Sequence, residues 1–179
     1  MNTNRVTVRY AKALYAFASD EKKAEAVSKD MRLISEIVKI PEFRNMLENP
    51  VIFPSKKIAV FEEVMKNKVD NVTLKFFKLL AENKREAYLS ALARNYIDIY
   101  RKNNNIKSAD LTLTFTPDEE LKKDVVLILS QKFKSNIEIA TKKDKNIIGG
   151  FVLTVDGMQY DVSVATKLKE VKKEMLKAE

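Results

Sequence analysis

The stretch RKNNNIKSADLTLTFTPDEE, residues 101–120, contains the point at which the hydrophobic pattern of this chain changes its period. The three consecutive asparagines at 103–105 favour turns and caps over a helix interior. After them, the alternating LTLTF of residues 111–115 predicts a half-buried strand. Before them, apolar residues recur at helical spacing. We therefore predict a domain boundary here, with residues 1–104 and 105–179 as separate domains.

The first domain is predicted to be a bundle of about six helices joined by short loops. The apolar stripes that indicate these helices run from Val6 to Phe17, Ala24 to Val38, Phe43 to Leu47, Ile58 to Met65, Val72 to Leu80 and Leu89 to Ile99. Pro41 is expected to end the second helix, and Pro54 suits the start of the fourth. Asn71 is available as an N-cap for the fifth.

The second domain is predicted to be a small β-sheet domain with two helices, so that the whole chain is α+β. Thr116 is expected to cap the first of these helices, with Pro117 in its first turn and Glu119 closing a capping box. The apolar residues expected to face the core from this helix are Leu121, Val125, Ile128 and Leu129.

Further patterns complete this domain. Ile137 and Ile139 suggest a second strand, and Asp156-Gly157 between two apolar runs is a strong signal of a β-hairpin. A closing amphipathic helix is expected after Ser163. Its apolar side is predicted to hold Val164, Leu168, Val171 and Met175.

Two short motifs have both a structural and a chemical interpretation. Gly149-Gly150 before an apolar strand indicates a bulge or a close backbone contact, whereas a phosphate-binding loop would need a helix after it. Asp161 and Ser163 are good helix caps, and without a histidine they do not make a catalytic pair. We therefore predict structural roles for Gly149, Gly150, Asp156, Gly157, Asp161 and Ser163.

The composition argues against an enzyme. The chain has no cysteine and no histidine, which excludes disulfides, zinc–thiolate sites and every Ser-His arrangement. It has only three glycines, and no Gly-rich nucleotide-binding string occurs. No apolar run approaches the ~18 residues that cross a bilayer. We predict no catalytic residue, no metal site and no cofactor; an enzyme built on carboxylates or lysine stays open, without convergent residues to support it.

The charge is uneven along the chain. Residues 1–104 hold 20 Lys and Arg against 13 Asp and Glu, and residues 105–179 hold 13 against 12. A basic half is typical of a protein that binds an acidic partner or nucleic acid, so an RNA-binding helical bundle is an alternative. We favour a solvated lysine-rich face, because the charges are scattered and do not alternate with exposed aromatics.

Four strings spread along the chain form a recognisable set. They are YAKA at residues 10–13, AENKR at 81–85, IGGFVL at 148–153 and DVSVATKL at 161–168. In this order they resemble the δ subunits of bacterial F-type ATP synthases and the related mitochondrial oligomycin-sensitivity-conferring protein. The family usually has glycine where this chain has Val162, which questions the local backbone because a β-branched residue disfavours positive φ.

The resemblance implies a non-catalytic stator subunit that links the catalytic head of ATP synthase to its peripheral stalk, so that proton-driven rotation is coupled to ATP synthesis. The helical domain is then expected to bind the N-terminal helix of an α subunit between its first and fifth helices. By motif alignment this groove holds Tyr10, Ala13, Leu14, Phe17, Phe76 and Leu79. From the first-helix residues alone, ordinary bundle core is the preferred interpretation.

The resemblance also implies the remaining partners. The C-terminal domain is expected to meet the C-terminal helices of the stalk b subunits. No nucleotide or nucleic acid is expected to bind the chain directly, and it is expected to be a monomer in isolation. The complex is expected to hold it at the cytoplasmic face of the inner membrane.

Overall fold

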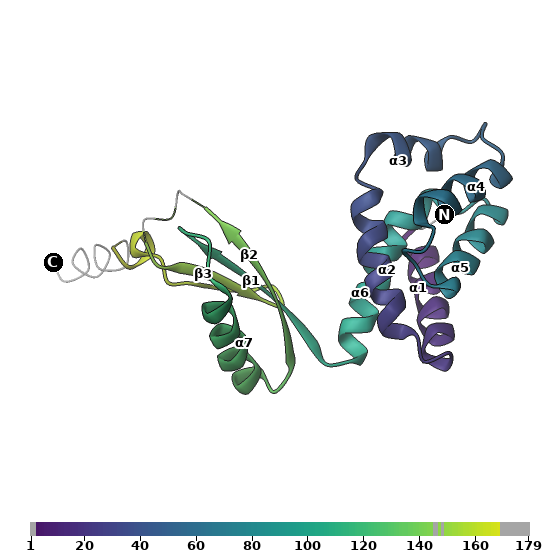
Figure 1. Ribbon diagram of the computed structural model, residues 1–179. Coiled ribbons are helices and arrows are strands. Elements are labelled where there is room, and N and C mark those ends of the chain that lie inside the picture. The colour runs from purple at the N-terminus through teal and green to yellow at the C-terminus, as the bar shows by residue number, and fades with distance from the viewer. Residues whose placement is uncertain (1–2, 145–146, 148, 169–179) are drawn as a thin grey trace. The chain divides into compact units, whose positions relative to one another are not determined.

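The computed structural model describes residues 3–144, 147 and 149–168, and the chain divides into two compact units, Met1–Asn103 and Asn104–Glu179 (Figure 1). The division falls within the run of asparagines. The first unit is helical, and the second combines a four-stranded sheet with helix. The predicted α+β fold class, a bundle of about six helices followed by a small β-sheet domain, is confirmed.

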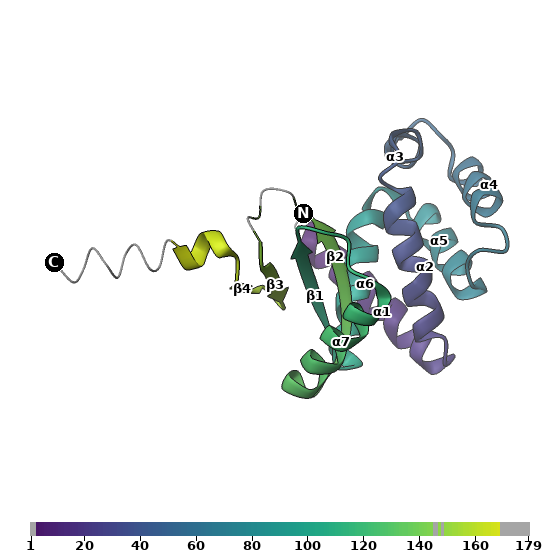
Figure 2. The same ribbon diagram turned by 60° about the vertical axis from the view of Figure 1, so that its left-hand side comes forward.

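The helices of the first unit are α1 (Thr3–Asp20), α2 (Ala24–Ile37), α3 (Pro41–Glu48), α4 (Pro54–Met65), α5 (Asn71–Glu82), the 3-10 helix η1 (Glu86–Tyr88) and α6 (Leu89–Asn103). Helix α6 packs against both α1 and α2, α4 packs against α5, and α3 lies beyond the C-terminal end of α2 (Figure 2). Large buried side chains fill the centre, among them Phe61 and Phe77, whose rings stack with 3.6 Å between centroids. This single core fixes the positions of α1 and α5.

Prolines and caps explain where several helices begin. Pro54 occupies the first turn of α4, as predicted. Pro41 occupies the first turn of α3, whereas α2 has already ended at Ile37. The predicted cap of α5 is wrong: Asp70 is the N-cap, because its carboxylate accepts a hydrogen bond from the N–H of Val72 at 2.9 Å. Asn71 is the first helical residue.

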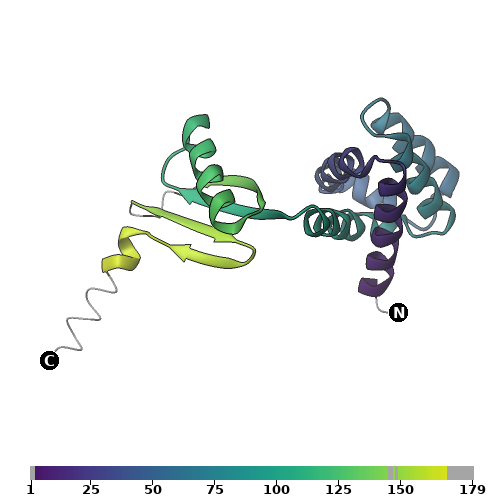
Figure 3. The same ribbon diagram turned by 90° about the horizontal axis from the view of Figure 1, so that it is seen from below.

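The second unit consists of β1 (Ile106–Leu113), α7 (Glu119–Phe133), β2 (Asn136–Lys143), β3 (Phe151–Val155) and β4 (Met158–Asp161). The strand order is β2-β1-β3-β4, with β1 and β2 parallel and the other pairs antiparallel. Helix α7 is the crossover between the parallel strands and covers one face of the sheet (Figure 3). The core between them is built on Ala109, Leu129 and Val155.

The start of α7 and the extent of β1 differ from the predictions. Asp118, not Thr116, is the N-cap, and its carboxylate accepts from the N–H of Leu121 at 2.8 Å. The helix therefore begins at Glu119, two residues later than the proline signal suggested. Strand β1 ends at Leu113, where pairing with β2 and β3 stops, so Phe115 lies outside the strand and is exposed.

The buried face of α7 is narrower than predicted. Leu129 is buried and Val125 packs against it, but Ile128 is exposed. Ile128 lies about 100° around the helix from Leu129, and a helix on one sheet face buries only one stripe. Helical structure follows Ser163 over residues 164–168, and the expected Val171 and Met175 lie outside the described residues.

The backbone just before β3 packs closely against the backbone just after β4. A Cβ atom on Gly150 would lie 2.3 Å from the carbonyl oxygen of Val162, and Gly150 has φ +79°. Val162 itself does not have positive φ, so the β-branched residue that replaces the family's glycine is accommodated. The hairpin turn between β3 and β4 is Asp156-Gly157, with φ of 48° and 83°, as a type I′ turn requires.

The residues before the last described helical segment act as caps. The N–H of Ser163 donates to the carboxylate of Asp161 at 2.9 Å. The Ser163 hydroxyl accepts from the N–H of Thr166 at 3.3 Å, and the Thr166 hydroxyl donates to Asp161 at 2.8 Å. Both side chains are therefore engaged in local structure.

Candidate functional site

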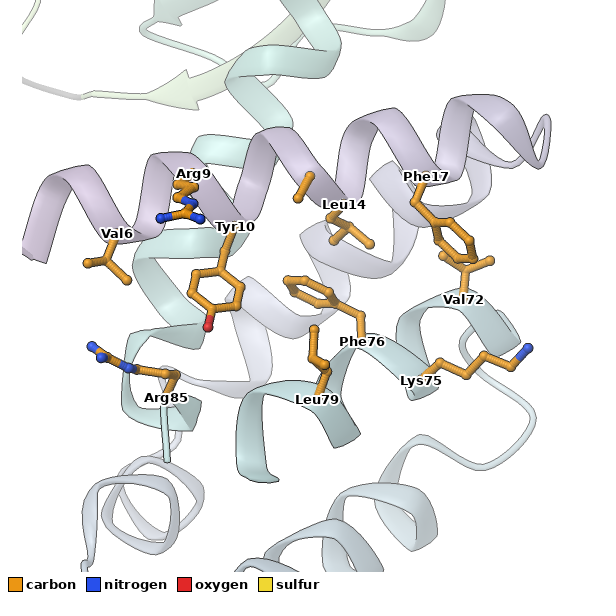
Figure 4. A pocket seen from close by; sticks show the side chains of 11 residues that line it. Val6, Arg9, Tyr10, Leu14, Phe17, Val72, Lys75, Phe76, Leu79 and Arg85 are labelled. Carbon is orange, nitrogen blue, oxygen red and sulfur yellow. The ribbon is translucent and has the colours of Figure 1, made fainter. Parts of the chain in front are cut away.

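A groove runs along the first unit between α1 and α5 (Figure 4). Its volume is about 670 Å³. The residues that line it are Val6, Arg9, Tyr10, Ala13, Leu14, Phe17, Val72, Lys75, Phe76, Leu79 and Arg85. Most are apolar, and they form a surface long enough to receive a segment of another chain.

All the residues expected from the resemblance lie in this groove. They divide into a floor and a rim. Leu14 and Phe76 are 2% and 8% exposed and belong to the core of the unit. Phe17 and Leu79 are both 47% exposed, and Ala13 is also exposed. The sequence could not separate these two groups, because floor and rim are both apolar.

Helical spacing explains how the walls are built. On α1, Tyr10, Leu14 and Phe17 follow one another at i, i+4 and i+7, which places them on one face. The rings of Tyr10 and Phe76 meet edge to face, with 6.4 Å between centroids. This contact joins the two walls at the floor. Ala13 has the smallest side chain in the lining, which leaves space for a side chain of a bound segment.

The prediction missed Val6, Arg9, Val72, Lys75 and Arg85. Spacing could have found Val6, which lies one helical turn before Tyr10, and Val72, which lies one turn before Phe76. It could not have found Arg85. That residue follows α5 and reaches the groove because Lys84 adopts φ 54°, which turns the chain back.

The charge of the lining has one sign. Arg9, Lys75 and Arg85 are basic, and among the described residues no aspartate or glutamate lines the groove. The lining also lacks an acid–base pair or an activated nucleophile, so its geometry suits binding rather than chemistry. An apolar floor with cations at its rim fits an amphipathic helix that carries acidic groups beside its apolar face.

The described parts of the chain show neither a metal-ligand cluster nor a membrane-spanning helix. Among residues 3–144, 147 and 149–168, no three acidic side chains gather as metal ligands would. Over the same residues, no helix combines the length and hydropathy that a membrane span needs.

Comparison with known proteins assigns the family. The family model "ATP synthase delta (OSCP) subunit" matches residues 6–175. The chain is 35% identical to ATP synthase subunit delta of Christiangramia forsetii over 98% of this chain and 95% of that protein. It is 33% identical to ATP synthase subunit delta of Clostridium botulinum over 96% of both.

A solved structure has the same fold. A chain of the Toxoplasma gondii mitochondrial ATP synthase hexamer superimposes with a TM-score of 0.71 at 23% identity, covering 95% of this chain and 97% of that one. None of these matches supports the nucleic-acid alternative. The chain belongs to the ATP synthase delta (OSCP) subunit family, and it is a non-catalytic stator subunit of an F-type ATP synthase.

Proposed function

We propose that the groove between α1 and α5 binds the N-terminal helix of an ATP synthase α subunit, and that the second unit binds the C-terminal helices of the stalk b subunits. The observation that supports the α-subunit contact is the groove itself. Its apolar lining comes from α1 and α5, and the side chains at its rim, Phe17 and Leu79, remain exposed in the unbound chain. Exposed Met158 and Tyr160 on the sheet offer apolar area for the second contact.

A helix docks in such a groove through apolar side chains at i, i+3, i+4 and i+7. Burial of apolar area stabilises the complex by about 25 cal/mol per Å², against the cost of association. Tight binding therefore needs a groove that is already formed. The floor residues Leu14 and Phe76 provide this, since both are part of the core of the unbound unit.

Isothermal titration of the full chain with the ~20-residue N-terminal peptide of the cognate α subunit tests the proposal, because a helix in a groove is a compact recognition unit. We expect saturable one-to-one binding, with the peptide gaining helical circular dichroism. Absence of binding would overturn the groove assignment. Salt-sensitive retention on an RNA column would then favour the nucleic-acid alternative.

The domain division, the location and the oligomeric state are part of the same proposal. Residues 1–104 carry the α-subunit contact and residues 105–179 the stalk contact. The chain is a monomer in isolation and lies at the cytoplasmic face of the inner membrane through the complex. Treatment that dissociates both the catalytic head and the stalk contact should release it from isolated membranes, and sedimentation of the purified chain should give the monomer mass.

A further inference from the structure

Two arginines lie at the same end of the groove and come from opposite walls. Arg9 belongs to α1, and Arg85 lies just beyond the end of α5 (Figure 4). The third cation, Lys75, lies at the other end, near Phe17 and Val72. The groove is therefore asymmetric along its length, with two guanidinium groups at one end and one ammonium group at the other.

The backbone holds Arg85 in place. Its N–H donates to the carbonyl oxygen of Leu80 at 2.8 Å, and its guanidinium carbon lies 5.9 Å from the centre of the Tyr88 ring. The next residue, Glu86, is buried and forms an ion pair with Lys57. A side chain on so well fixed a backbone loses less conformational entropy when it binds a partner group.

Neither arginine is neutralised within the part of the chain that the structure describes. No ion pair there involves Arg9 or Arg85, and no carboxylate lines the groove. Arg9 is exposed and Arg85 is half-buried, and the largely apolar side chains of Tyr10 and Leu79 line the same groove. A planar guanidinium binds a carboxylate through two parallel hydrogen bonds, and it does so more strongly where water is reduced.

We propose that Arg9 and Arg85 together bind a carboxylate of the docked helix and thereby fix the direction in which the helix lies. This inference rests on the proposed function, since the occupant is the N-terminal helix of the α subunit. The part of that helix that carries the carboxylate then lies at the arginine end of the groove. The reversed helix would place its carboxylate beside Lys75, a single and strongly hydrated charge.

The test uses the full chain and fluorescence anisotropy of the labelled N-terminal α peptide. Arg9→Gln and Arg85→Gln are measured singly and together, from about 50 mM to about 500 mM salt, which shortens the screening length several-fold. Lys12→Gln is the matched control, because Lys12 is an exposed cation of α1 outside the groove. Each acidic residue of the peptide is also replaced by its amide in turn.

We expect the double variant to bind about 10-fold or more weakly and to lose most of the salt dependence, as removal of close charge pairs does. Lys12→Gln should bind like the wild type. One amide peptide should be weakened in the wild type but not in the double variant. Equal affinity and equal salt dependence of wild type and double variant would overturn the arginine inference alone. Failure of the wild type to bind would overturn both this inference and the groove assignment.

Discussion

Lys57 of α4 and Glu86 of η1 form an ion pair in which the side chains are only 3% and 8% exposed. The Lys57 ammonium also donates to the carbonyl oxygen of Leu47 at the end of α3, at 2.8 Å. One buried charge pair thus joins three segments of the bundle. Because Glu86 follows Arg85, the pair also holds one end of the groove.

Replacing one partner of this pair should be strongly destabilising. Lys57→Met leaves Glu86 buried without its cation, and breaking a buried ion pair in this way costs about 3–5 kcal/mol. Urea unfolding followed by circular dichroism measures the loss. The double variant Lys57→Met/Glu86→Leu should recover most of it, because the unpaired charge is gone. A single variant as stable as the wild type would contradict this role.

Ala13→Asp should abolish binding of the α-subunit peptide while the fold is kept. Ala13 is exposed on the groove, so the unbound protein tolerates a charge there, but docking would remove that charge from water beside the apolar side chains of the groove and cost about 2 kcal/mol or more. Ala16→Asp is the control, because Ala16 is exposed on the same helix outside the groove. Equal loss of binding in both variants would mean that the charge acts on α1 as a whole.

Tyr10→Asp is a less clean test of the same groove. Tyr10 packs on the core and touches Phe76, so its replacement removes packing within the free unit as well as docking surface. We expect this variant to lose binding and also to unfold at lower urea concentration than Ala13→Asp. Circular dichroism in urea separates the two effects.

Gly150→Ala should destabilise the second unit more than Gly157→Ala. Both residues have positive φ, which costs a non-glycine residue about 1–2 kcal/mol. At Gly150 the new Cβ would also meet the carbonyl oxygen of Val162 at 2.3 Å, whereas at Gly157 it would meet no atom within 4 Å. Thermal unfolding of the two variants compares the cost. Equal losses would show that the backbone near Val162 moves freely.

Asp30 should make stability depend on pH. Its carboxylate accepts from the hydroxyl of Thr73 at 2.6 Å and from the N–H of Asp70 at 2.8 Å. Burial nevertheless raises the pKa of Asp30 above its ordinary value of 3.8. The folded state therefore holds this proton more tightly than the unfolded chain does.

We therefore compare the free energy of unfolding of the wild type with that of Asp30→Asn. The difference should fall as the pH rises from 3.8 to the raised pKa of Asp30, and it should stay constant at higher pH. Urea titrations of both proteins between about pH 3 and pH 7 measure this difference. A difference that does not change with pH would contradict the assignment. A rise with pH would mean that the two hydrogen bonds outweigh burial.

Local signals in the sequence were reliable where one residue determines the backbone. Pro54 starts α4, and Asp156-Gly157 forms the hairpin turn, because proline and glycine restrict or permit φ regardless of the surroundings. The N-cap predictions failed where two nearby residues could each have capped the helix. Asp118 and Asp70 cap their helices instead of Thr116 and Asn71, since the better-placed carboxylate reaches the free N–H groups.

The site was predictable only in part, for a physical reason. Apolar spacing identifies the faces of α1 and α5 that turn toward each other, but it does not show how far apart the two helices lie. This distance determines which apolar side chains are buried, so that Leu14 belongs to the core and Phe17 to the rim. Arg85 depends on the left-handed conformation of Lys84, a position where glycine or asparagine is more usual. The residue type at position 84 therefore does not predict the turn.

Strand β1 has a mechanical consequence for a subunit of the stator. The chain passes from the first unit at Asn103 into β1, the strand that is hydrogen-bonded to β2 on one side and β3 on the other. Tension that arrives along this strand acts on both rows of hydrogen bonds in shear, so many bonds must break at once. An edge strand pulled along its axis would load only one such row. The linker therefore leads into a strand that two rows of hydrogen bonds hold in the sheet.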